Sequence, residues 1–105
     1  MAQVSKRATA RRDLIQHYIY LVEQAGVETA DRFLMKAEET FFDLAQMPAI
    51  GVGLPVRPEA LKGLRKWQVK EFERFLIFYQ PRETGICIVR VLYGTRDWWS
   101  LLGIE

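Results

Sequence analysis

The sequence predicts an α+β domain in which a helical hairpin packs on a small antiparallel sheet. Two observations predict this fold class. Apolar residues recur at helical spacing through most of residues 9–47, whereas the second half of the chain holds dense runs of β-branched and aromatic residues. Helices followed by strands are typical of an antiparallel sheet with helices on one face. The expected order is β-α-α-β-β-β with a short C-terminal helix or tail, and 105 residues fit a single domain.

The first expected helix begins near Thr9, a candidate N-cap, and stops at Gly26. Five apolar residues at helical spacing form its predicted buried stripe: Leu14, Ile15, Tyr18, Ile19 and Val22. His17, the only histidine, lies at the edge of this stripe. No cysteine, serine or carboxylate pairs with it at a recognisable spacing, so we expect a boundary residue and not a general base.

A second helix follows directly, and Pro48 ends it because the residue before a proline leaves the helical region. Its stripe consists of Ala30, Phe33, Leu34, Ala37, Phe41, Leu44 and Ala45. Two amphipathic helices joined by a short glycine-containing turn form an antiparallel hairpin. Prolines and glycines then indicate a loop over residues 48–63, with a short helical turn at residues 59–62.

Strands are expected at residues 64–69, 74–80 and 86–93, with Gln3–Lys6 as an added strand at the start and a turn at residues 81–85. Both faces of residues 86–93 are largely apolar. A strand of this kind lies inside a sheet that is covered on both faces.

Composition limits the chemistry. Cys87 is the only cysteine and sits in an apolar run, so we expect a buried thiol and no internal disulfide. One histidine and one cysteine are too few for a zinc-type site, and we expect no metal and no cofactor. No apolar run approaches the roughly 18 residues of a membrane span, and the polar N-terminus is unlike a signal peptide. We therefore expect a cytoplasmic protein.

Charge is unevenly distributed although the net charge is only +2. Residues 23–43 carry two basic and six acidic residues, whereas residues 44–105 carry nine basic and six acidic ones. The basic second half is a candidate landing site for an acidic partner segment or a target. A solvated hairpin edge is the alternative.

Five pieces of sequence, in this order and spacing, carry a resemblance to a known family: Arg-Arg-Asp-Leu-Ile at 11–15, Met-Pro through Gly at 47–51, Gly-Leu-Arg at 63–65, Phe-Leu-Ile-Phe-Tyr at 75–79, and Ile-Val-Arg-Val-Leu-Tyr-Gly-Thr-Arg-Asp at 88–97. Together they resemble the ParE branch of the RelE/ParE toxins, also called plasmid stabilisation proteins. The resemblance covers nearly the whole chain, and its strongest piece ends the last strand. Tyr93 stands where ParE-like proteins usually carry histidine.

The resemblance implies the toxin of a type II toxin–antitoxin system that inhibits DNA gyrase by binding and is neutralised by a cognate antitoxin. The alternative is a metal-independent, ribosome-dependent mRNA endoribonuclease of the RelE type. That chemistry needs a base, an acid and clustered cations. Leu76 stands where the nuclease branch places arginine, and Leu102 roughly where it places tyrosine. We therefore assign no catalytic residue and expect no direct nucleic-acid binding. A homodimer and a toxin–antitoxin hetero-oligomer both remain open, as does a chain that has kept the fold but lost toxicity.

Two groups of residues are candidates for partner contacts. The expected antitoxin contacts are Leu14, Tyr18, Arg65 and Trp67, on the helical hairpin and the basic strand. The expected target contacts are the loop after the second helix and, in the C-terminal segment, Arg96, Trp98 and Trp99. Adjacent tryptophans on a helix or strand cannot both point into one small core, so one of them should cover a neighbouring apolar groove or meet a partner. A fully buried tail is the alternative.

Overall fold

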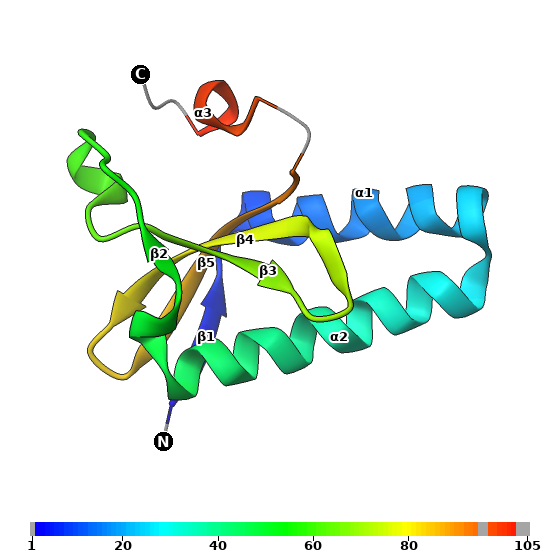
Figure 1. The fold of residues 1–105 in the computed structure, drawn as a ribbon, viewed down its shortest axis with the longest axis horizontal. Helices are drawn as coiled ribbons and strands as arrows, with labels where there is room; N and C mark the ends of the chain where they lie inside the picture. Colours follow the sequence, from blue (N-terminus) through cyan, green and yellow to red (C-terminus); the bar gives the residue numbers. More distant parts are fainter. Residues whose placement is uncertain (1, 95–96, 103–105) are drawn as a thin grey trace.

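The computed structural model describes residues 2–94 and 97–102 (Figure 1). The helices and strands are β1 (Gln3–Lys6), α1 (Ala8–Ala25), α2 (Val27–Gln46), β2 (Val52–Gly53), β3 (Arg65–Val69), β4 (Phe72–Arg82), β5 (Gly85–Tyr93) and α3 (Trp98–Leu101). Short 3-10 turns lie at Pro48–Ile50 and Glu59–Leu61. The α+β fold class and the predicted order of the main elements are confirmed, and the two-residue strand β2 is an addition.

The strands form one sheet in the order β1-β5-β4-β3-β2. The strands β2 to β5 are antiparallel, as expected, but β1 pairs with β5 in parallel, from Gln3 opposite Gly85 to Lys6 opposite Ile88. This makes the sheet mixed. Parallel neighbours need a long crossover between them, and here the helical hairpin begins that crossover. The interior position predicted for residues 86–93 is confirmed.

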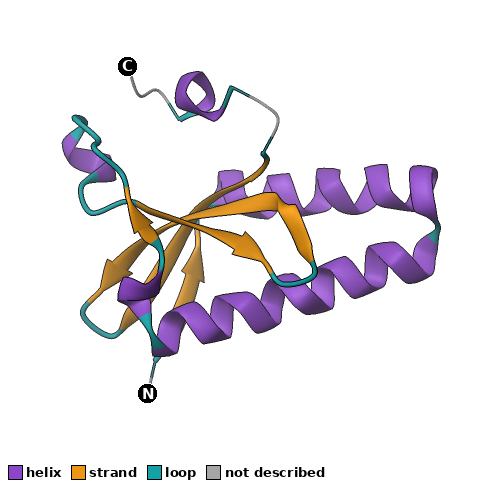
Figure 2. Cartoon of the chain, viewed as in Figure 1, coloured by secondary structure: helices purple, strands orange, loops and turns teal. Residues whose placement is uncertain are grey.

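The two helices form an antiparallel hairpin that covers one face of the sheet (Figure 2). Gly26 joins them with a φ of 95°, a conformation that glycine adopts without a steric penalty. The predicted stop of the first helix is therefore confirmed. The prediction of Thr9 as its N-cap is wrong. The N-cap is Arg7, and the Thr9 hydroxyl donates instead to the carbonyl of Val89 at 3.2 Å.

Two apolar clusters cover the two faces of the sheet. The larger one lies between the sheet and the helices and includes Phe33, Phe41, Ile77 and Tyr79. The smaller one lies on the opposite face, which we call the outer face. Its buried members are Leu61, Leu64, Phe78, Val89 and Leu92, with Leu54, Val56, Leu76, Trp98 and Leu102 packed against them. The loop before β3 and the segment containing α3 thus cover the outer face.

The predicted buried stripe of α1 is only partly correct. Leu14 is buried, but the side chains of Ile15 and Ile19 are 61% and 53% exposed. The face turned toward the protein carries Asp13, which is buried, and His17, which is half-buried. Both polar side chains bond to β5, and this contact sets the rotation of the helix.

The turn predicted at residues 81–85 is shorter in the structure. Pro81 and Arg82 belong to β4 and pair with Ile86 and Gly85 of β5. Only residues 83–84 form the turn. Proline has no N–H to donate to a neighbouring strand. The sequence therefore predicted that the strand ends before Pro81.

Candidate partner-binding groove

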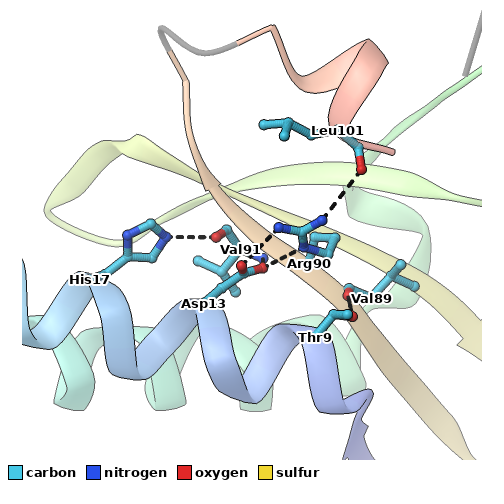
Figure 3. A network of polar contacts seen from close by, with 7 residues as sticks. All are labelled: Thr9, Asp13, His17, Val89, Arg90, Val91 and Leu101. Atoms are coloured by element: carbon cyan, nitrogen blue, oxygen red, sulfur yellow. Dashed lines mark hydrogen bonds and ion pairs between the residues drawn. The ribbon is translucent and has the colours of Figure 1, made fainter. Parts of the chain in front are cut away.

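Side chains of α1 bond to the edge of β5 where β1 stops (Figure 3). The pairing of β1 with β5 ends at Ile88. Beyond it, the Thr9 hydroxyl donates to the Val89 carbonyl, the Val91 N–H donates to Asp13 at 3.0 Å, and His17 Nε2 lies 2.7 Å from the Val91 carbonyl oxygen. These side chains are spaced four residues apart and share one face of the helix. They bond to the backbone groups of β5 with which a further strand would otherwise pair.

An ion pair strengthens this contact. Arg90 donates from Nε to Asp13 Oδ2 at 2.7 Å and from Nη2 to Oδ1 at 2.9 Å, a bidentate arrangement. The hydrogen bond to Asp13 raises the pKa of Arg90. Arg90 also donates from Nη1 to the carbonyl of Leu101 at 3.3 Å, which ties α3 to the sheet. Because Asp13 is buried and fully engaged, this network is structural.

A groove opens beside this network, between α1 and the ends of β4 and β5. A pocket of 340 Å³ is lined by Gln16, His17, Tyr20, Phe75 and Tyr93. A second hollow of 310 Å³ shares Tyr20, Phe75 and Tyr93 with it and extends over residues 71–74. We call the two together the aromatic groove. The ring of Phe75 lies 4.9 Å from His17 and 5.2 Å from Tyr93, centroid to centroid.

The helix α1, which forms one wall of this groove, carries exposed apolar side chains. Tyr20 lines it and is 55% exposed, and Ile19 and Ile15 precede it on the same helix. Exposed apolar residues beside an aromatic groove are typical of a partner surface. The sequence prediction missed it because it placed Ile15 and Ile19 in the core. The spacing of Ala10, Leu14 and Leu21, all buried, was the signal for the correct rotation of the helix.

The four predicted antitoxin contacts do not form one surface. Leu14 is buried in the larger cluster, so in this structure its side chain is not exposed to a partner. The Tyr18 hydroxyl donates to Asp31 of α2 at 2.7 Å, and this hydrogen bond raises the pKa of Tyr18. Arg65 donates to the carbonyl of Gly51 at 2.6 Å. Trp67 packs, half-buried, against the larger cluster.

The predicted target contacts lie over the outer face. Trp98 packs on Phe78 with ring centroids 5.3 Å apart, and Lys66 Nζ lies 5.2 Å from the centre of the Trp98 ring. Trp99 stacks on Trp98 at 4.2 Å and is 38% exposed. The prediction that only one of the two tryptophans enters a core is confirmed. Arg96 lies outside the described residues.

The outer face is apolar where a nuclease would need polar groups. Leu76, Phe78 and Leu92 form a continuous contact with Trp98 and Leu102. Cys87 is buried, as predicted. Among residues 2–94 and 97–102, no three His, Cys, Asp or Glu side chains come together as a metal site. No helix in this part of the chain is long and apolar enough to cross a membrane.

Comparisons with known proteins agree with this architecture. Residues 4–98 match the family described as "ParE toxin of type II toxin-antitoxin system, parDE". A solved structure, "Chromosomal ParDE TA system from P. aeruginosa", is similar with a TM-score of 0.70 and 22% sequence identity, over 89% of this chain and 96% of that chain. That likeness shows the fold. No curated protein sequence matches the chain. The family match agrees with the expectation that the chain is a toxin and not an enzyme. Because the family match spans most of its length, this chain belongs to the ParE toxins of type II toxin–antitoxin systems.

Proposed function

We propose that the chain is a toxin that inhibits DNA gyrase by binding, acts in the cytoplasm, and is held inactive by a cognate antitoxin docked in the aromatic groove. Family membership supports the toxin role. The observation that carries the choice of binding over catalysis is the outer face. Leu76 and Phe78 of β4 are packed there with Trp98, so apolar side chains stand on that surface where a nuclease would need a base, an acid and cations.

The groove supports an antitoxin segment that presents apolar side chains. Thr9, Asp13 and His17 already occupy the edge of β5 at Val89 and Val91, so a partner cannot extend the sheet there through its backbone. The exposed stripe of Ile15 and Ile19 favours an amphipathic helix lying along α1, with a side chain inserted between Tyr20 and Phe75.

Antitoxin docking is tested by co-expressing the toxin with the product of the adjacent reading frame and measuring affinity by calorimetry. Tyr20→Ser removes an exposed aromatic side chain from the lining of the groove and should weaken the complex by about tenfold or more, because hot-spot contacts contribute roughly 1–2 kcal/mol. The matched control is Met35→Ser, since Met35 is 59% exposed on α2. Equal losses for the two variants would argue against the groove.

The target is tested with purified components. Added toxin should stop negative supercoiling by gyrase, leave ribosome-bound message intact, and lose its effect when antitoxin is present. Cleavage of message in a translation reaction would instead establish the endoribonuclease alternative. Normal growth on expression without antitoxin would indicate that the chain has lost toxicity.

A further inference from the structure

A buried glutamine on β4 holds two arginines side by side. Gln80 is 3% exposed. Its side-chain nitrogen donates to the carbonyls of Ala60 at 2.9 Å and Lys62 at 3.0 Å, which fixes the orientation of the amide. Its oxygen accepts from Arg7 Nη2 and from Arg82 Nη2, each at 3.1 Å. The two guanidinium groups are therefore close neighbours, and we call them the arginine pair.

The arginine pair has no acidic counter-ion in the described part of the chain. The ion pairs there involve Lys6, Lys36, Lys70 and Arg90, and neither Arg7 nor Arg82 lies within 4.0 Å of a carboxylate oxygen. Two cations that share one neutral oxygen repel each other. An anion between them would relieve this repulsion.

The geometry of the pair is prepared before any ligand arrives. Arg7 makes a second bond, from Nη2 to the carbonyl of Ala60 at 3.1 Å, and the carbonyls that hold Gln80 come from the same loop. Each guanidinium carries five N–H groups, and toward the residues that the structure describes both donate only from Nη2. The remaining donors are free to form bidentate bonds to an oxoanion. Arg82 is exposed, so a ligand can reach it.

We propose that the arginine pair is an oxoanion-binding site that takes a carboxylate from an acidic segment of a protein partner. A carboxylate suits it because the positive charge is concentrated at one point. Nucleic-acid strands bind through many phosphate contacts at once, and this chain has a net charge of only +2 with an acidic block at residues 23–43. The site is separate from the aromatic groove and does not depend on gyrase as the target.

The probe for the test is an oligo-glutamate peptide with blocked termini, titrated into the full chain. The Nε–H resonances of Arg7 and Arg82 in NMR spectra should both shift on binding. Arg82→Gln should weaken binding by roughly tenfold, the loss expected for charge-assisted hydrogen bonds. Arg82→Lys should recover little of this lost affinity, because lysine keeps the charge but lacks the planar guanidinium group that forms two parallel hydrogen bonds to a carboxylate.

Lys62→Gln is the matched control, since it removes one positive charge from the loop that holds Gln80 without removing a side chain that bonds to the arginine pair. It should change the affinity for the peptide by no more than about twofold. Equal losses for Arg82→Gln and Lys62→Gln would reduce the site to unspecific attraction and overturn the proposal. Tighter binding of a single-stranded DNA oligonucleotide of equal charge would overturn the carboxylate assignment. Circular dichroism of each variant separates loss of binding from loss of fold.

Discussion

Removing the carboxylate of Asp13 tests whether the bond between α1 and β5 holds the fold together. In Asp13→Ala, Arg90 loses both bonds of its bidentate pair and the Val91 N–H loses its acceptor. Breaking a buried ion pair from one side costs about 3–5 kcal/mol. The Arg90 side chain is 23% exposed, so water can hydrate the guanidinium and replace part of the lost interaction. We therefore expect a loss near the lower limit, about 3 kcal/mol.

This loss is large for a small domain, whose unfolding free energy is about 5–15 kcal/mol. The corresponding fall in melting temperature is at least about 12 °C, at roughly 4 °C or more per kcal/mol. Thermal and urea unfolding followed by circular dichroism measure it. The control is Asp31→Ala, because that carboxylate accepts a single hydrogen bond from Tyr18 at an exposed site; we expect a loss below about 1 kcal/mol.

The double variant Asp13→Leu with Arg90→Met gives the sharper test. It removes both charges, so no buried ion is left without its partner. We expect it to be more stable than the sum of the single changes predicts, by about 1 kcal/mol or more. Additivity to within about 0.5 kcal/mol, or a loss below about 1 kcal/mol for Asp13→Ala alone, would refute the reasoning.

Three further changes probe other parts of the fold. Tyr79→Phe removes the hydroxyl that bonds the loop after α2 and should lower the free energy of unfolding in urea by about 1–3 kcal/mol. Burial raises the pKa of Tyr79 above its ordinary 10.0, so the stability that the wild type gains from the neutral phenol is fully present below pH 10.0 and is lost as the pH rises through the folded-state pKa. The variant should lack this pH-dependent component. Gly85→Ala places a Cβ against the backbone of Gln3 and should increase hydrogen exchange along β1, while unchanged exchange would contradict the close approach. Trp98→Ala should increase binding of a hydrophobic dye by uncovering the outer face, and Trp99→Ala should change it little.

The sequence predicted the elements well because their signals are local. The stop at Gly26 and the end of α2 before Pro48 depend on backbone preferences of single residues. The apolar character of both faces placed β5 inside the sheet without any knowledge of its neighbours. Leu76 was predicted to be unsuited to catalysis because it stands where the nuclease branch of the resembled family places arginine, and its place in the outer cluster agrees with this.

The spacing of Ala10, Leu14 and Leu21 indicated the rotation of α1, but the groove itself was missed because its walls come from segments that are distant in the sequence. The pattern of apolar residues on α1 placed Ile15 and Ile19 in the core, because such a pattern does not identify a buried carboxylate such as that of Asp13. Asp13 faces inward only because Arg90 and Val91, far along the chain, supply donors for it. The arginine pair is hidden in the same way, because Arg7 and Arg82 meet only when the loop carbonyls orient Gln80.

The bonding of α1 to β5 also bears on how the chain folds as it is synthesised. Asp13 and the Arg90 that it binds are 77 residues apart, and β1 pairs with β5 over a similar separation. Contacts between residues so far apart in the sequence slow the folding of small domains. When the helical hairpin leaves the ribosome, its apolar face and its carboxylate have no partners yet. The growing chain therefore cannot complete this part of its fold until β5 has been translated. During that interval a chaperone or a bound partner has access to surfaces that the folded protein buries.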